Sequence, residues 1–427
     1  MRLKEKGGIF MQIFAASYVL PISSPPIAEG AIAVHEGRII DIGPLDNVSS
    51  AWNAPVHDYP GSVITPGLVN AHTHLELTHF PSWKIRKGLD YQPRTYVDWV
   101  VQVIKIKRGL ELHELELSLR EGLRISLEAG TTAFGDVLSD IRLLPLFSGG
   151  TSCGRLFFEA VGHEPLACQT LLAKLADSLH SFNSGKLLAG LAPHAPHTVS
   201  PEFFQALRRL AADSSLPMMV HLAESLEEVA FMHDSTGKIA EILYPLVHWE
   251  EYLPRPMRTT STAYLDTLGI LDSSTIAVHC IHITPADAEI LKKRGVGVVL
   301  CPRSNDRLAV GRAPVHLLKK LGIPLALGTD SLASNDSLSL WDEMRFVLTT
   351  TPGLFTPEEL LRMASLGGAE LLGVSKETGS LEKGKRADFL MVRPPANVLK
   401  NDLHRALIEE GRLDEVFVAG VPIEVTA

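Results

Sequence analysis

The sequence lacks the features that mark secreted, membrane-spanning or nucleic-acid-binding proteins. Only four cysteines occur among 427 residues and none forms a C-x-x-C pair, which argues against a disulfide framework or a thiolate zinc site. No apolar run reaches the roughly 18–20 residues that a membrane-spanning helix needs. Acidic residues outnumber basic ones by 49 to 40, for a net charge of −9. Without a basic cluster, we expect neither a nucleic-acid nor a membrane partner.

The first twenty residues resemble a secretion signal, because a polar segment with lysines precedes an apolar one. Residues 1–8 are polar and carry lysines, and residues 9–20 are mostly apolar. The apolar part continues into a segment typical of strands and turns, so we interpret it as part of the folded protein and predict a cytoplasmic location. Met11 is an alternative natural start, which would make residues 1–10 an upstream extension.

Both ends of the chain have the pattern of short strands around turns. Residues 31–34 and 38–42 flank a three-residue turn that ends in glycine, which is a hairpin signal. Two apolar segments near the C-terminus have the same pattern. We therefore predict that residues 1–65 and 375–427 form one small β-sandwich domain.

The middle of the chain, residues 66–374, alternates between short apolar strands and helical stretches. Helix starts are well marked, because Ser200, Thr284 and Thr356 each precede a proline in the manner of an N-cap. Eight strands are predicted, at residues 63–71, 131–136, 155–161, 187–193, 218–221, 275–279, 296–301 and 324–329. Eight strands with crossover helices predict an α/β fold whose catalytic domain is a TIM-like (β/α)8 barrel.

Four polar residues stand at the C-terminal ends of these strands, where enzymes of this architecture place their metal ligands. His72 and His74 are two residues apart, and residues i and i+2 of a strand point to the same side. His221 closes the fifth strand and Asp330 follows the eighth. Each fits a structural role when taken alone. Together they predict a site for one divalent metal ion, zinc first, with iron or manganese as alternatives.

Two further residues are candidates for proton handling. Glu224 lies three residues past His221, where a loop can turn its carboxylate back over the metal. The alternative is a surface glutamate, because Glu227 and Glu228 follow closely. His279 ends the sixth strand and either orients the attacking water or binds a metal itself. The fourth strand ends without the lysine that often bridges two metals, so we favour a single metal.

Several residues around these strand ends are candidates for substrate binding. Each of them could instead have a loop or structural role. For Glu76 and Trp83, which follow His72 and His74, we favour the structural role over substrate binding. The candidates are His194, Glu76, Trp83, His197, Asn305 and Ser331.

With these motifs in order, the sequence resembles the amidohydrolase superfamily, and within it the branch of guanine, S-adenosylhomocysteine and aminofutalosine deaminases. The matching stretches span nearly the whole chain and lie at residues 66–74, 193–196, 221–224, 278–280, 301–305, 328–331 and 379–388. As an ordered set they are highly specific for the branch and much less so for the substrate.

The resemblance implies a hydrolase that acts on carbon–nitrogen bonds other than peptide bonds and deaminates a cyclic amidine. It implies that the four residues named above bind one zinc or iron, and that His194 contacts the substrate. The catalytic residues would be His279, Glu224 and Asp330. His279 would orient the activated water, Glu224 would protonate the ring nitrogen beside the amino-bearing carbon, and Asp330 would pass a proton to the departing amine.

One departure from the branch bears on the substrate. Adenosylhomocysteine-type relatives carry a Pro-x-Glu element after a tryptophan-containing helix, and no such element follows Trp99 here. The pattern of Glu76, Trp99 and Arg108 is closer to aminofutalosine deaminases, and His197 stands where relatives often have tyrosine. We therefore predict a small-molecule substrate of the aminopurine nucleoside type, with aminofutalosine first and adenosylhomocysteine or methylthioadenosine next.

Two other functions stay open at this point. A hydrolase of a cyclic amide or a chlorinated ring would share the metal ligands but attack a different centre, and ammonia release would distinguish the two enzymes. A catalytically silent metal- or ligand-binding protein would belong to another class, although the intact ligand set and Glu224 do not favour it. A homo-oligomer is compatible with the sequence, which does not fix the oligomeric state.

Overall fold

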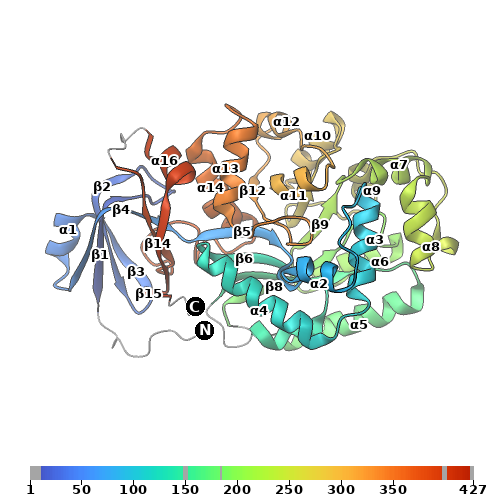
Figure 1. Cartoon of the computed structure of the whole chain (residues 1–427), viewed down its shortest axis with the longest axis horizontal. Helices are drawn as coiled ribbons and strands as arrows, with labels where there is room; N and C mark the ends of the chain where they lie inside the picture. Colours follow the sequence, from blue (N-terminus) through green and yellow to red (C-terminus); the bar gives the residue numbers. More distant parts are fainter. Residues whose placement is uncertain (1–10, 148–151, 183–184, 397–401, 424–427) are drawn as a thin grey trace.

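The computed structural model describes residues 11–147, 152–182, 185–396 and 402–423. The proposed upstream extension, residues 1–10, lies outside them. The described chain forms an eight-stranded parallel sheet and a separate seven-stranded mixed sheet (Figure 1). Among the described residues, no helix is both long and apolar enough to cross a membrane. The predicted α/β class, a TIM-like barrel beside a small β domain, is confirmed.

The parallel strands pair in chain order and form a barrel. They are β5 (Leu68–Thr73), β6 (Thr131–Leu138), β7 (Cys153–Ala160), β8 (Leu187–Pro193), β9 (Met218–Leu222), β10 (Thr275–His279), β11 (Gly297–Leu300) and β12 (Leu325–Leu327). The ring closes where Thr73 bridges Asp330 just past β12. There the Asp330 amide donates to the His72 carbonyl at 3.1 Å. A strand is present at each of the eight predicted places.

The first of these predicted strands is divided between the two sheets, which corrects its bounds. β4 (Val56–Pro66) pairs with β1 and β13 in the small sheet, and β5 enters the barrel after Gly67. A Cβ atom on Gly67 would lie 2.0 Å from the Thr132 hydroxyl oxygen, so only glycine permits this close passage. An unbroken apolar run could not reveal the change because both strands are buried here. The change near residue 66 supports the predicted domain boundaries, which we keep as a proposal.

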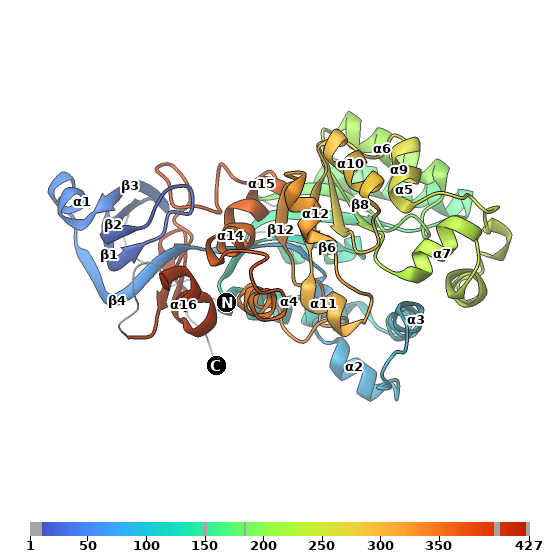
Figure 2. The same cartoon turned by 90° about the horizontal axis from the view of Figure 1, so that it is seen from above.

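Helices cover the outside of the barrel (Figures 1 and 2). They include α4 (Leu112–Glu128), α5 (Pro165–Ser181), α6 (Pro201–Asp213), α7 (Leu226–Asp234), α9 (Ser261–Thr267), α10 (Pro285–Arg294), α12 (Val315–Lys320), α13 (Leu340–Thr350) and α14 (Pro357–Arg362). Ser200, Thr284 and Thr356 accept hydrogen bonds from backbone amides three residues on, as predicted for N-caps.

The connection from β5 to β6 is unusually long because it carries extra helices. The chain forms η1 (Leu75–Leu77), α2 (Phe80–Arg86) and α3 (Tyr96–Lys107) before α4. Helix α3 reaches the loop after β12, since the Trp99 indole donates to the Ala333 carbonyl at 2.9 Å. This insertion therefore links the first and last strands of the barrel at the end where the predicted site lies.

The small sheet is built from both ends of the chain. Its strands are β1 (Gln12–Val19), β2 (Ile27–His35), β3 (Arg38–Pro44), β4, β13 (Phe389–Arg393), β14 (Arg412–Val418) and β15 (Val421–Pro422), in the order β15-β14-β13-β4-β1-β2-β3. The sheet curls over its own apolar face. The ring of Phe14 on β1 lies 5.0 Å from that of Phe389 on β13 and 5.1 Å from that of Phe417 on β14. A single rolled sheet thus gives the sandwich-like packing.

Replacing Phe389 should destabilise this small sheet. Phe389 is fully buried, and its ring stacks on Phe417 with centroids 4.3 Å apart. We expect Phe389→Ala to lower the free energy of unfolding by about 3–5 kcal/mol through lost burial and a cavity. Urea denaturation followed by circular dichroism measures the loss, with Leu117→Ala on the exposed face of α4 as the control. Equal unfolding midpoints for the two variants would contradict the assignment of this core.

Candidate metal centre and active site

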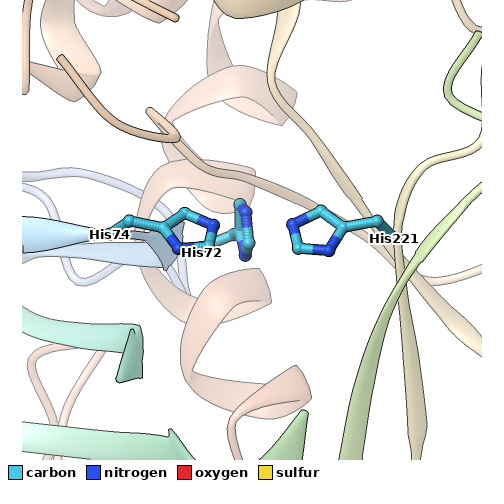
Figure 3. Close-up of side chains that lie close together, drawn as sticks. All are labelled: His72, His74 and His221. Atoms are coloured by element: carbon cyan, nitrogen blue, oxygen red, sulfur yellow. The ribbon is translucent and has the colours of Figure 1, made fainter. Parts of the chain in front are cut away.

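Three buried histidines meet at the C-terminal end of the barrel. His72 lies near the end of β5, His74 follows that strand, and His221 lies in β9. Each offers a ring nitrogen, and the three nitrogens lie within 4.8 Å of one another. Figure 3 shows the rings of His74 and His221 on either side of His72. The fold thus brings together three of the four residues that the sequence predicts as metal ligands.

An irregularity in β5 aims His72 into the barrel. Val69 and Ala71 pack in the interior core, so simple alternation would send the next side chain outward. The pairing of β5 with β6 shifts register between Asn70 and Thr73, which is the mark of a β-bulge. Bulges bend a strand and redirect a side chain, and here the redirected side chain is an imidazole.

Asp330 completes this group from the far edge of the barrel. Its Oδ1 lies 3.9 Å from Nε2 of His72 and 3.8 Å from Nε2 of His74. Its Oδ2 accepts hydrogen bonds from Ser304 at 2.7 Å and Ser334 at 2.8 Å. Two atoms bound to one zinc ion at roughly 2.1 Å each can be up to about 4.2 Å apart. Oδ1 is therefore placed to share an ion with both histidines.

The state of the histidines suits a metal ion. Nδ1 of His221 donates to the His194 carbonyl at 2.9 Å, which leaves the other ring nitrogen with a free lone pair. Among the described residues, the buried Nε2 of His72 has no hydrogen-bond partner. Burial lowers the pKa of His74 to about 3 and that of His221 to about 4. Neutral imidazoles with one carboxylate form a ligand set that zinc or iron accepts, so the residues fit the expected metal.

Glu224 turns back toward this group directly after β9. Ala223 has a left-handed backbone with φ of 51°, and the Glu228 carboxylate accepts hydrogen bonds from the amides of Ala223 at 2.9 Å and Glu224 at 3.0 Å. This places a Glu224 oxygen 3.6 Å from Nε2 of His279. Burial, opposed by the nearby His221, raises the pKa of Glu224 to about 8. Burial therefore favours the protonated form of this carboxyl.

His279 also departs from regular strand geometry. Val278 faces the interior core, and a φ of 72° at His279 turns the next side chain to the same region. Asn305 Oδ1 accepts a hydrogen bond from Nδ1 of His279 at 2.8 Å, so Nε2 is left as an acceptor facing Glu224. Asp330 is left-handed as well, with φ of 58°. Such conformations cost energy in non-glycine residues and concentrate at functional sites.

Comparison with known proteins gives the family of the chain. The model of the Amidohydrolase family matches residues 63–423. The chain belongs to the amidohydrolase family. A relative from Moorella thermoacetica, named 5-methylthioadenosine/S-adenosylhomocysteine deaminase, is 31% identical over 419 residues, which cover 94% of this chain and 91% of the relative. A relative of the same name from Nitratidesulfovibrio vulgaris is 33% identical over 379 residues, which cover 85% of this chain and 79% of the relative.

Solved structures share the architecture of this amidohydrolase. A zinc-bound adenosine deaminase from Xanthomonas campestris has a TM-score of 0.79 and 26% identity, covering 96% of this chain and 92% of that one. Aminofutalosine deaminase from Helicobacter pylori, in complex with methylthio-coformycin, has a TM-score of 0.84 and 22% identity, and the match covers 97% of this chain and 100% of that one. The second likeness concerns the fold alone.

Three of the six predicted substrate-binding residues lie against the metal-binding group of this amidohydrolase. The ring of His194 is 4.8 Å from that of His221, and its Nδ1 lies 2.9 Å from the Thr198 hydroxyl. Asn305 holds His279, as described above. Ser331 follows Asp330, and its hydroxyl accepts from the Ala333 amide at 3.2 Å. Their roles toward a substrate stay predictions.

The other three predicted substrate-binding residues have different surroundings. His197 is buried beside Tyr96, and within the described chain neither of its ring nitrogens has a hydrogen-bond partner. Glu76 is buried and forms an ion pair with Lys107 at 2.8 Å. Trp83 is 4% exposed and packs in an apolar cluster under α2 and α4. The placement of Trp83 suits a structural role, which the sequence also allowed.

Sequence reasoning missed four residues that shape the site. Glu228, weighed only as a marker of a surface, is 1% exposed and holds the turn that carries Glu224. Ser304 and Ser334 hold Asp330, and only Ser304 lies inside a recognised motif. Tyr96 packs against Glu224, and the charge of that carboxylate helps to raise the pKa of its phenol above the ordinary range, after burial as the larger cause. Tyr96 lies far from the motifs in sequence and gave no signal.

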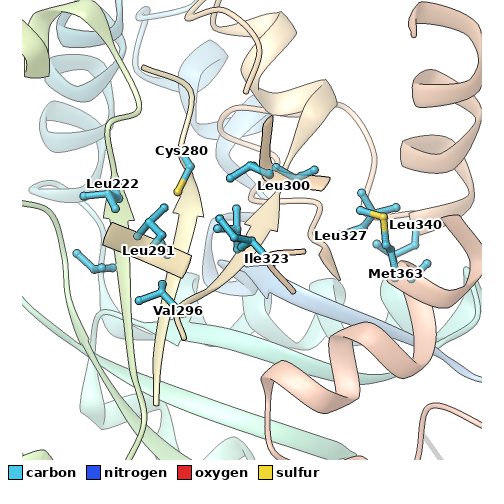
Figure 4. Close-up of a cluster of buried hydrophobic side chains, with 14 of the residues drawn as sticks. Leu222, Cys280, Leu291, Val296, Leu300, Ile323, Leu327, Leu340 and Met363 are labelled. Carbon is cyan, nitrogen blue, oxygen red and sulfur yellow. The ribbon is translucent and has the colours of Figure 1, made fainter. Parts of the chain in front are cut away.

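Apolar side chains support the strand ends from the outside of the barrel. Leu222 beyond His221, Cys280 beyond His279 and Leu300 at the end of β11 pack in one buried cluster with Leu291 and Ile323 (Figure 4). Close packing of this kind resists rotation of the neighbouring backbone. The supporting layer therefore fixes the directions from which the polar side chains enter the barrel.

Loss of one histidine should abolish metal binding. His74→Ala removes a ligand, and even residues that only support ligands change metal affinity by roughly 10–100-fold. We expect the purified variant to retain less than about a tenth of the metal found in the wild type, measured by inductively coupled plasma mass spectrometry. His113→Ala on the surface of α4 is the matched control, since that side chain is 64% exposed. Equal metal content in the two variants would contradict the assigned centre.

The buried Glu224 carboxyl predicts a pH-dependent stability difference in the metal-free protein. Its pKa is about 8 in the fold and ordinarily 4.5, so between these values the unfolded chain loses a proton that the fold retains. The contribution of Glu224 to wild-type stability falls across this window and then levels off, whereas Glu224→Gln has no such proton to lose. The unfolding free energy of Glu224→Gln relative to the wild type should therefore rise from about pH 4.5 to about pH 8.

Urea titrations of chelator-treated protein at a series of pH values measure this difference. Glu202→Gln, at an exposed position in the first turn of α6, is the matched control. A constant difference for Glu224→Gln would show that its carboxyl is not buried in the protonated form.

Proposed function

We propose that this amidohydrolase is a metal-dependent hydrolytic deaminase of an adenine-bearing nucleoside. One observation carries the proposal. A Glu224 oxygen lies 3.6 Å from Nε2 of His279, beside the three histidines His72, His74 and His221 and the Asp330 carboxylate. Deamination of an aromatic ring needs a proton donor for the ring nitrogen next to a site that activates water, and this arrangement supplies both.

The residues of the chain divide the proton transfers among them. A divalent cation held by the four ligands would lower the pKa of water toward neutrality. Glu224 donates its proton to the ring nitrogen, which makes the amino-bearing carbon accept the water oxygen. Asp330 Oδ1 takes one proton from the water and gives it to the departing amine, while His279 orients the water through Nε2. The second water proton returns to Glu224, and the products are a ring carbonyl and ammonia.

The relatives support a purine nucleoside as the substrate. Both curated relatives are named for deamination of 5-methylthioadenosine and S-adenosylhomocysteine. The missing Pro-x-Glu element after Trp99 keeps aminofutalosine as the first candidate. All three compounds share an adenine ring on a ribose with a substituted 5′ position. We propose this shared chemistry as the substrate class.

The metal and the setting of the enzyme are parts of the same proposal. Zinc is the first candidate, supported by the ligand set and by the zinc in the related adenosine deaminase structure, and iron is the alternative. We also propose a cytoplasmic enzyme that acts on a small molecule and binds no nucleic acid.

Ammonia release from a panel of amino-bearing compounds tests the function. We expect turnover of adenosine, methylthioadenosine, adenosylhomocysteine or aminofutalosine, and none of guanine or cytosine. Glu224→Gln should lower kcat by roughly 100-fold or more, because general acid–base catalysis contributes about 10²–10⁴-fold. Bound metal must stay at the wild-type level, and Glu202→Gln serves as the control. Chloride release from a chlorinated ring without ammonia, or full activity in Glu224→Gln, would overturn the proposal.

A further inference from the structure

The side of the barrel mouth opposite Glu224 carries its own group of charged residues. Glu76 follows β5, Ser139 follows β6, Glu159 lies near the end of β7, and Lys107 reaches in from α3. Glu224 follows β9, His279 is the last residue of β10, and Asp330 follows β12. His194, directly after β8, stands between the two groups.

Glu159 points into the barrel. On β7, Phe157 packs in the interior core whereas Leu156 and Phe158 belong to the outer clusters. Side chains two residues apart share a face, so Glu159 lies on the interior face, one step nearer the mouth than Phe157. The strand register places it beside Ala192 of β8, two residues before His194. Within the described part of the chain, no hydrogen bond or ion pair holds its carboxylate.

Lys107 is held by Glu76 and Ser139, and its charge acts on the Glu159 carboxylate. Its Nζ donates to Glu76 Oε1 at 2.8 Å and to the Ser139 hydroxyl at 2.5 Å. Glu76 is fixed by three hydrogen bonds, since it also accepts from the hydroxyl and the amide of Ser139. Lys107 keeps one further N–H, and its side chain is 28% exposed.

The charges of this group act on one another and reach the site. Burial alone would lower the pKa of Lys107, but Glu76 and then Glu159 outweigh it and raise the value. Burial raises the pKa of Glu159, and Lys107 opposes the rise. Lys107 is also among the charges that lower the pKa values of His74 and His194. The cluster is therefore close to the site, and two of its functional groups are free.

We propose that Glu159 and Lys107 form the subsite that binds the two ribose hydroxyls of the nucleoside. A vicinal diol offers two O–H donors and also acceptor oxygens, and the unpaired carboxylate beside an ammonium with a spare N–H complements both. The inference rests on the proposed function and extends it to specificity. The sugar-bearing nitrogen and the amino-bearing carbon lie on opposite sides of a purine. A base with its amino group toward Glu224 therefore directs its sugar to the β6–β7 side.

Kinetics with 5′-methylthioadenosine and its 2′-deoxy and 3′-deoxy forms tests this subsite. We expect the wild type to prefer the ribonucleoside by roughly 10–100-fold in kcat/KM, the size expected for a hydrogen bond to a charged group. In Glu159→Gln the preference should shrink to within about threefold, chiefly through a higher KM for the ribonucleoside. The kcat for the deoxy forms should stay near the wild-type value. Glu202→Gln, a surface glutamate, should keep the full preference.

The outcomes separate this proposal from the proposed function. Loss of ammonia release from every nucleoside in the wild type would overturn the proposed function and this inference together. Turnover with equal kcat/KM for ribo and deoxy forms in the wild type would overturn the subsite alone. So would a Glu159→Gln variant that retains the preference or loses kcat equally on all three compounds. Glu159→Asp, which keeps the charge at a shorter reach, should retain part of the preference and replaces Glu159→Gln if that variant does not fold.

Discussion

The hydrogen bond from the Asp330 amide to the His72 carbonyl, 3.1 Å long, is where the barrel closes and where its site is assembled. One residue takes part in both. Its backbone pairs with β5 through the bridge to Thr73, and its side chain reaches the two histidines of that strand. Because closure sets the distance between β12 and β5, any opening of the ring would also separate the ligands. Fold and chemistry are thus coupled at a single point.

Burial then decides the charges of the site. Away from water the charged form of every group is disfavoured, so histidines become neutral ligands and Glu224 retains its proton. Asp330 is the exception. Burial alone would raise its pKa, but the neighbouring His74 and His279 and the Ser304 hydroxyl outweigh that effect and lower the pKa. The same environment therefore shifts the pKa values of two buried carboxyl groups, Glu224 and Asp330, in opposite directions.

Regular strand periodicity was enough to predict the barrel and to place His72, His74, His221 and Asp330 at strand ends. It could not predict how those side chains enter the site, because the entry depends on irregular backbone. A bulge redirects His72, and left-handed residues follow β9 and β10. Glu228 was also out of reach, since its burial depends on packing against Ser261, 33 residues away. The local sequence pattern is sufficient to predict helices and strands. The bulge, the left-handed residues and the burial of Glu228 depend on contacts between segments that are distant in sequence.

The left-handed residues need a source of stabilisation, and the structure shows one at Ala223 and one at Cys280. Each such conformation costs of order 1–3 kcal/mol and persists only where surrounding contacts over-determine it. At Ala223 the constraint is the pair of hydrogen bonds to Glu228. At Cys280 the constraint is the hydrogen bond that its amide donates to the Leu222 carbonyl at 3.0 Å, together with packing in the outer apolar cluster. Loss of either constraint would therefore favour relaxation of the turn toward a less strained backbone.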